Sequence, residues 1–194
     1  MRTISFVVSL FTTVSLSAQQ KAYYYQIPDT PTTYTATTVA ARMIDGLGFR
    51  YFWATEGLTA KDLQFSPSKD ARTCLETIEH IDGLVQLLLN AVNKRSANFG
   101  SNSNEKLSFA QLREKTLRNI QAASEILKLP GTMLEEFTMG VESSNGKTIY
   151  PFWNIINGPV EDAIWHVGQV VLLRRSSGNP LPKGVNFLIG NKTE

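Results

Sequence analysis

The sequence has one cysteine and two histidines, and these scarcities limit the chemistry available to it. Cys74 is the only cysteine, so no disulfide can form within the chain. Its spacing to Ile78 and Ile81 is helical, which makes it a small core residue rather than a nucleophile. Because the only histidines are His80 and His166, a metal site of three histidines within one chain is excluded.

Clusters of positive charge and long apolar runs are also missing. The chain has 19 Lys and Arg against 17 Asp and Glu, and no basic cluster is interleaved with aromatic residues as in surfaces that bind nucleic acid. Arg174 and Arg175 form a pair that suits the C-terminus of a helix. No apolar run reaches the ~20 residues of a membrane-spanning helix. We therefore expect no nucleic-acid partner and no stable membrane span.

The first 18 residues are typical of a secretory signal. Arg2 supplies the positive charge, residues 4–14 the apolar stretch, and residues 15–17 (SLS) the small-x-small pattern of a cleavage site. Loss of Arg2 with the signal changes the formal charge to 18 minus 17, or +1. The sequence predicts an exported protein, periplasmic or secreted, with cleavage after Ser17 or Ala18.

Beyond the signal, the sequence shows helical rather than strand periodicity. An extended arm is expected over residues 19–34, a connection over residues 59–67, and residues 131–149 stay ambiguous. Apolar residues recur at helical spacing in four segments: Thr35 to Thr55, Ser68 to Asn93, a third that follows the capping pair Ser108 and Gln111 and ends before Pro130, and a fourth that ends near Ser177. Pro159 is either the first residue of the fourth helix or a kink in a longer helix begun near Pro151. The fold predicted for residues 35–194 is all-α, a four-helix bundle in one domain with a C-terminal tail.

The fourth predicted helix carries two polar residues within an apolar sequence. At about 100° per residue, Asp162 and His166 fall on one side of this helix, and Glu161 points to the other. His80 lies at the edge of the apolar arc of the second helix, so it can reach the bundle interior. Two imidazoles and a carboxylate suit zinc, iron, nickel or manganese and leave coordination positions open. We expect His80, Asp162 and His166 to bind one divalent metal.

Other interpretations of these polar residues stay open. Each histidine could be hydrogen-bonded in the core, and Asp162 could pair with Arg174 or another cation. Glu76 and Gln169 lie one turn from the two histidines. Glu76 could act there as an acid or base and Gln169 as a hydrogen-bond partner of a ligand or substrate. Both could equally be solvated polar residues of their helices.

Three stretches of the sequence resemble the DinB-like superfamily of metal-binding four-helix bundles, which includes the bacillithiol transferases. They are residues 57–63 with Ser66-Pro67, residues 78–81 (IEHI), and residues 162–169 with Arg174 and Gly178-Asn179-Pro180. The resemblance spans roughly residues 35–183 and implies that His80 and His166 ligate one divalent metal. Where the family has the first histidine of a His-x-x-x-His pair, this chain has Asp162. A carboxylate at that position lowers the charge of the site by one and weakens the Lewis acidity of the metal.

Two functions of different class are consistent with these observations. The first is a metal-dependent hydrolase or transferase that acts on a small-molecule substrate, in which the metal activates water or a thiol. The second is a non-catalytic exported binding or structural bundle with a degenerate metal site, in which Trp53, Trp153, Trp165 and the tyrosines line an apolar pocket. A homodimer is compatible with both. Metal content of the purified protein distinguishes the two functions.

Overall fold

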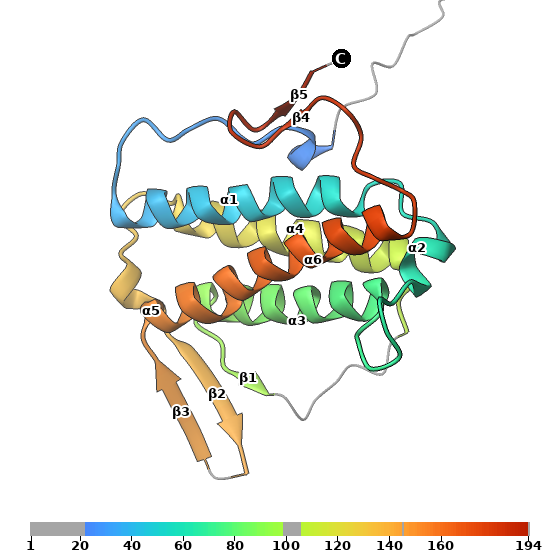
Figure 1. The fold of residues 1–194 in the computed structure, drawn as a ribbon. Helices are drawn as coiled ribbons and strands as arrows, with labels where there is room; N and C mark the ends of the chain where they lie inside the picture. The colour runs from blue at the N-terminus through green and yellow to red at the C-terminus, as the bar shows by residue number, and fades with distance from the viewer. Residues whose placement is uncertain (1–21, 99–105, 145, 194) are drawn as a thin grey trace, which may run out of the picture.

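Four long helices make up the body of the molecule in the computed structural model, which describes residues 22–98, 106–144 and 146–193 (Figure 1). The long helices are α1 (Ala36–Thr55), α3 (Cys74–Val92), α4 (Phe109–Leu127) and α6 (Glu161–Ser176), and the short ones are α2 (Ala60–Gln64) and α5 (Phe152–Ile155). The expectation of a mostly helical protein is confirmed. The predicted signal, residues 1–18, lies outside the described residues. Within the described ranges, no helix combines the length and the hydropathy that crossing a membrane requires.

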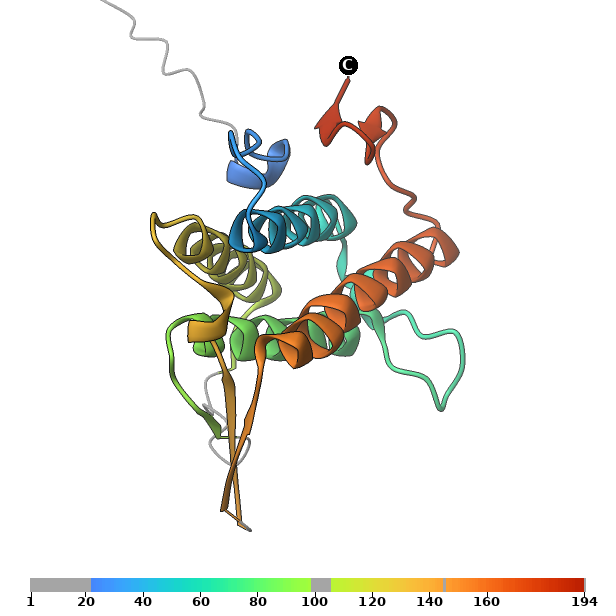
Figure 2. The same ribbon diagram turned by 90° about the vertical axis from the view of Figure 1, so that its left-hand side faces the viewer.

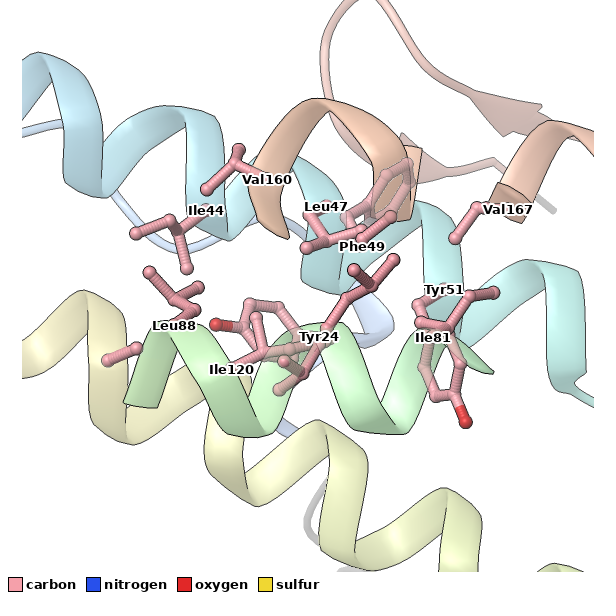
Figure 3. Packing of buried hydrophobic residues seen from close by; sticks show 14 of the residues in the cluster. Tyr24, Ile44, Leu47, Phe49, Tyr51, Ile81, Leu88, Ile120, Val160 and Val167 are labelled. Carbon is pink, nitrogen blue, oxygen red and sulfur yellow. The ribbon is translucent and has the colours of Figure 1, made fainter. Parts of the chain in front are cut away.

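The long helices pack around one apolar core. α1 and α3 each lie against both α4 and α6, so every long helix has two long neighbours (Figure 2). Figure 3 shows side chains that fill the space between them. Ile44 and Leu47 of α1, Ile81 of α3 and Ile120 of α4 are at most 1% exposed, and Val167 of α6 is 3% exposed. Removal of this apolar surface from water is the main force that holds the helices together.

Side-chain caps decide where the long helices begin. Thr35, Thr73 and Ser108 each accept a hydrogen bond from the backbone N–H three residues later, and the side chain of that later residue bonds back to the cap. The predicted capping pair of Ser108 and Gln111 is confirmed. The predicted start of the second helix at Ser68 is wrong, because the Thr73 cap starts α3 at Cys74.

A π turn joins α5 to α6 and decides between the two interpretations of Pro159. The turn covers Ile156–Val160, and Pro159 is buried inside it. Proline has no N–H to donate, and the wider turn accommodates the missing bond. Pro159 is therefore a kink in a helical stretch that begins at Phe152, not the first residue of α6. One inserted residue rotates the helix that follows by about 100°, so this turn sets which side of α6 faces the core.

A small sheet corrects the prediction of a purely helical chain. β2 (Met139–Ser143) and β3 (Gly146–Tyr150) form an antiparallel hairpin, and β1 (Ala97–Asn98) pairs with β2 in parallel. The hairpin projects away from the bundle below α5 (Figure 1). Every residue of β3 is exposed. Its sequence, GKTIY, also lacks the alternation of apolar and polar residues from which a strand is predicted.

The two ends of the described chain pack together next to α1. Tyr24, in a 3-10 turn (Tyr23–Tyr25), is 2% exposed, and its ring lies so close to Gly48 of α1 that a Cβ there would clash with it. The C-terminal tail forms a hairpin of β4 (Val185–Asn186) and β5 (Asn191–Lys192). The N–H of Ile27 donates to the carbonyl of Gly190 at 2.7 Å. The described part of the predicted arm, residues 22–34, is thus held between α1 and the tail.

Candidate metal centre

His80 of α3 and the pair Asp162 and His166 of α6 come together between these two helices. His80 Nε2 lies 3.4 Å from Asp162 Oδ2, and His166 Nε2 lies 3.3 Å from Asp162 Oδ1. The two imidazole rings meet edge to face with their centroids 4.6 Å apart. One ligand atom from each of the three residues lies within 4.8 Å of the others. The residues predicted from the sequence therefore form a cluster, here called the triad, that can hold a metal ion.

The distances between the imidazoles and the carboxylate match the separation of two ligands on one metal. Ligand atoms about 2.0–2.1 Å from a tetrahedral ion are about 3.4 Å from each other. An N–H···O hydrogen bond is shorter, most often about 2.9–3.0 Å between nitrogen and oxygen. The two Nε2-to-oxygen distances of 3.4 and 3.3 Å, each to a different oxygen of Asp162, are close to this ligand separation, and the 3.4 Å contact of His80 is also within hydrogen-bond distance.

Helix geometry separates Asp162 from the other charged residues of α6. Asp162 and His166 are four residues apart and share one side of the helix, whereas Glu161 is exposed and is not part of the triad. Arg174 lies about 18 Å further along α6 at 1.5 Å per residue. It donates hydrogen bonds to the carbonyls of Trp53 and Ala54. The alternative in which Asp162 pairs with Arg174 is therefore wrong.

Gln169 contacts the His166 ring from the side away from Asp162. Gln169 Oε1 lies 2.8 Å from His166 Nδ1. Because an amide oxygen only accepts, Nδ1 carries the hydrogen and donates it to Gln169. In the neutral ring, Nε2 then presents a lone pair toward the carboxylate of Asp162, so this contact is favourable only with a proton or a metal cation between the two atoms. A hydrogen bond of this kind fixes the tautomer and the orientation of histidines that ligate metals.

Glu76 is engaged at the start of α3. Its carboxylate accepts hydrogen bonds from the backbone N–H of Thr73 at 2.7 Å and from the Thr73 hydroxyl at 2.9 Å. These bonds, the backbone one foremost, lower the pKa of Glu76 below its ordinary value. Its hydrogen bonds are those of a capping box, a role that the sequence Thr73-x-x-Glu76 signals and that was overlooked.

The triad is partly open to solvent. The side chains of His80 and Asp162 are 34% and 37% exposed, and that of His166 is 13% exposed. A purely structural metal site closes its coordination shell with four protein ligands. Three ligands that are only partly buried leave a coordination position that water or a small molecule can reach.

Cys74 and the tryptophans lie away from this chemistry. Cys74 is confirmed as a core residue with 0% exposure, and burial, assisted by the charge of Asp62, raises the pKa of its thiol to about 11. Trp53 is 3% exposed in the core, whereas Trp153 and Trp165 are 73% and 71% exposed. An apolar pocket lined by all three tryptophans is therefore wrong, because one is enclosed and two face solvent.

A second polar cluster surrounds Arg174 at the opposite end of α6. Arg174 is 1% exposed. Its guanidinium donates to the carbonyls of Trp53 and Ala54 at 2.9 and 3.0 Å, and to the backbone and side-chain oxygens of Asn179 at 2.8 and 3.1 Å. These bonds tie the C-terminus of α6 to the end of α1.

Asp62 of α2 completes this cluster, here called the Arg174–Asp62 network. The carboxylate is 2% exposed and accepts hydrogen bonds from Ser177, Asn179 and Thr59. Burial alone would raise the pKa of Asp62, but these hydrogen bonds outweigh it and hold the pKa well below its usual range. The segment predicted as a connection, residues 59–67, thus contains a short capped helix with a structural carboxylate.

Comparison with known proteins identifies no relative of this chain. No known family matches it, and neither a curated protein nor a solved structure does. The observations that bear on function are therefore the residues of the chain and their geometry. The resemblance to DinB-like bundles rests on the short motifs quoted above and enters the function as a proposal.

Proposed function

We propose that this protein is an exported, divalent-metal-dependent enzyme of the DinB-like four-helix-bundle type, a hydrolase or transferase that acts on a small molecule. One observation carries the proposal: His80, Asp162 and His166, from two helices, converge with Nε2-to-carboxylate distances of 3.4 and 3.3 Å. The mostly helical fold is consistent with the bundle type. Zinc, nickel, iron and manganese all suit the ligand set.

Each residue of the triad has a distinct part in holding a metal. His80 and His166 would each supply Nε2, and Asp162, which lies beside both, would supply a carboxylate oxygen. Gln169 holds the His166 ring through Nδ1, so that Nε2 stays directed at the metal position. With a carboxylate in place of a third imidazole, the net charge of the metal and its ligands is one unit less positive.

The chemistry proposed for the triad needs an accessible and electrophilic centre. A bound divalent cation supplies Lewis acidity, with which water or a thiol becomes a nucleophile near neutral pH. His80 and Asp162 are about one-third exposed, so a small substrate can approach from solvent without opening the bundle. For an exported protein, an abundant intracellular thiol is a less natural substrate than it is for intracellular proteins of this type.

Metal content tests the proposal directly. Elemental analysis of protein purified without added metal and without an affinity tag should find about one divalent metal per chain. Asp162→Ala should lower the occupancy strongly, because two imidazoles alone hold a metal poorly. Activity toward a panel of activated esters and electrophiles, with water or a thiol as acceptor, should disappear in the same variant and on chelation.

Glu161→Ala is the matched control for Asp162→Ala. It removes the adjacent carboxylate from the same turn of α6, but from the exposed side. We expect full metal occupancy and a change in the free energy of unfolding within about ±0.5 kcal/mol, the range of surface substitutions. Equal metal loss in both variants, or in neither, would contradict the assignment of Asp162 as a ligand.

Export is proposed from residues 1–18 alone, since they combine Arg2, an apolar stretch and a small-x-small sequence. Intact-mass measurement of the protein isolated from its native source should give a chain that starts after Ser17 or Ala18. A mass that still includes Met1 would contradict the proposal, and so would recovery of the protein from the cytosol.

A further inference from the structure

A groove lies on the flank of α6 that faces away from the triad. It encloses about 250 Å³ between α1, α6 and the C-terminal tail. Its apolar lining comes from residues of α6 and the tail: Ile164, Val167, Val171, Leu181 and Phe187. On a helix of 3.6 residues per turn, these α6 positions are on the side opposite Asp162 and His166. The groove is thus a separate feature from the metal centre.

Two arginines give this apolar groove a positive charge. Arg50 of α1 and Arg175 of α6 both line it. Among the described residues, neither guanidinium forms an ion pair with a carboxylate. A groove with apolar walls and two uncompensated guanidinium groups is complementary to a ligand with an apolar body and a carboxylate head.

Arg50 is held in position before any ligand arrives. Its Nη1 donates to the carbonyl of Gly46 at 3.1 Å, and its guanidinium lies 5.8 Å from the centroid of the Phe187 ring. Phe187 in turn packs edge to face on Phe49 of α1 with ring centroids 5.8 Å apart. Since the cation is already ordered, a ligand carboxylate does not bear the entropic cost of ordering it.

Gly168 lines the groove and leaves it open. It lies in the middle of α6, and nothing lies within 4 Å of the position that a Cβ would take. The residue costs helix stability relative to alanine, because glycine is the poorest helix former after proline. A side chain at this position would project into the groove.

We infer that the groove formed by α1, α6 and the C-terminal tail binds a medium-chain carboxylate from solution, with its chain on the apolar walls and its carboxylate on Arg50 and Arg175. The volume of about 250 Å³ is below that of pockets for drug-sized ligands, which limits the ligand to a chain of no more than medium length. Because the groove and the triad lie on opposite flanks of α6, this binding does not depend on the proposed enzymatic function.

Calorimetric titration of the purified protein tests the inference, with octanoate as the probe, octanol as its uncharged analogue, and chelator present throughout. Octanoate should bind with one site per chain, and octanol should bind at least about tenfold more weakly, as expected when a hydrogen bond to a charged group is lost. Equal affinity for both would overturn the role of the arginines. Binding to vesicles of anionic lipid without binding of octanoate would overturn the choice of ligand.

Variants of the groove have matched controls elsewhere on the molecule. Arg50→Gln and Arg175→Gln should each raise the Kd for octanoate by about tenfold or more, whereas Lys61→Gln, the same charge change on the exposed side of α2, should leave it unchanged. Gly168→Leu should abolish binding by filling the groove. Gly83→Leu makes the same change at an exposed, unobstructed helical glycine of α3 and should not affect binding. Retained binding in a folded Gly168→Leu protein would overturn the location.

Discussion

α6 carries two polar clusters that differ in how their hydrogen-bonding groups are satisfied. At its C-terminal end, Arg174 is 1% exposed and its guanidinium has four hydrogen bonds of 2.8–3.1 Å to backbone and side-chain oxygens. At its N-terminal end, Asp162 is 37% exposed and faces two imidazole nitrogens at 3.3 and 3.4 Å. The first cluster is enclosed and has short hydrogen bonds, whereas the second is accessible and its contacts are longer.

This difference indicates which cluster stabilises the fold and which one binds a ligand. Burying a charge is favourable only when it is paired and hydrogen-bonded, and the Arg174–Asp62 network meets that condition with groups of its own chain. In the triad, by contrast, Asp162 faces two imidazole nitrogens, and no lysine or arginine of the described residues pairs with it. We therefore expect substitutions in the network to change the free energy of unfolding, and substitutions in the triad to change metal binding.

The largest expected effect follows from removing the buried cation. Arg174→Ala leaves the carbonyls of Trp53 and Ala54 without donors and should lower the free energy of unfolding by about 3 to 5 kcal/mol, the usual cost of breaking a buried charge network. Urea unfolding followed by circular dichroism measures this change. Arg175→Ala, one residue later and exposed, should change stability by no more than about 0.5 kcal/mol. Equal stability of the two variants would show that the Arg174–Asp62 network does not stabilise the fold.

Acidification should weaken the same network through Asp62. The pKa of Asp62 is lower in the folded chain than the ~3.9 of an unfolded aspartate, so its carboxylate stabilises the fold above about pH 4. That stabilisation is lost as the pH falls toward the folded-state pKa. Asp62→Asn should therefore be less stable than the parent by about 1.5 to 3 kcal/mol at pH 7, the range for hydrogen bonds to a charged group. The difference should shrink toward pH 3.

Unfolding curves collected from pH 7 down to pH 3 provide the measurement. Asp29→Asn is the matched control, since Asp29 is an exposed aspartate in the N-terminal arm. A constant stability difference between Asp62→Asn and the parent at all pH values would show that the charge of Asp62 does not contribute. A pH dependence of the same size in Asp29→Asn would show that the effect is not specific to the network.

The long helices could be predicted from the sequence because their apolar residues repeat at helical spacing and bury one face. The hairpin over Met139–Tyr150 could not, since its second strand is exposed throughout and has no apolar face to indicate it. Pairing between β1 and β2 also depends on residues more than 40 positions apart, as in Ala97 and Val141. Such long-range contacts leave no periodic signal in either segment.

The triad could be predicted for the same reason as the helices, because residues four apart share one side of a helix. Asp162 and His166 needed only that local rule, and the polar position of His80 on α3 supplied the rest. The Arg174–Asp62 network could not be predicted, since it depends on how α2 and residues 177–179 fold back onto α6. The pairing of Arg174 with Asp162, one of the alternatives that the sequence left open, is accordingly wrong, whereas the position of Arg174 and Arg175 in the last turn of the helix is confirmed.

A smaller effect should come from Gln169, which contacts the triad without belonging to it. Gln169→Leu removes the acceptor of the His166 Nδ1 hydrogen and should raise the Kd for the metal by about 10- to 100-fold, as for other groups that orient metal ligands. Gln169→Glu keeps an acceptor oxygen and should preserve tight binding. Competition with a metallochromic chelator measures both. Unchanged affinity in Gln169→Leu would show that this hydrogen bond does not orient the ring for the metal.

The smallest effect distinguishes a helix cap from a group that acts at the metal. Glu76→Ala removes the bonds to Thr73 and should lower the midpoint of thermal unfolding by about 1 to 4 °C. Metal occupancy should not change, because the carboxylate is held at the start of α3. Glu76→Gln should keep most of the stability, since glutamine also completes a capping box.

An acid or base at the metal would behave in the opposite way. Both variants would lose activity, and glutamine would not restore it, because an amide cannot exchange a proton in the same range of pH. Thermal unfolding and activity measured on the two variants therefore assign Glu76 either to the fold or to the reaction.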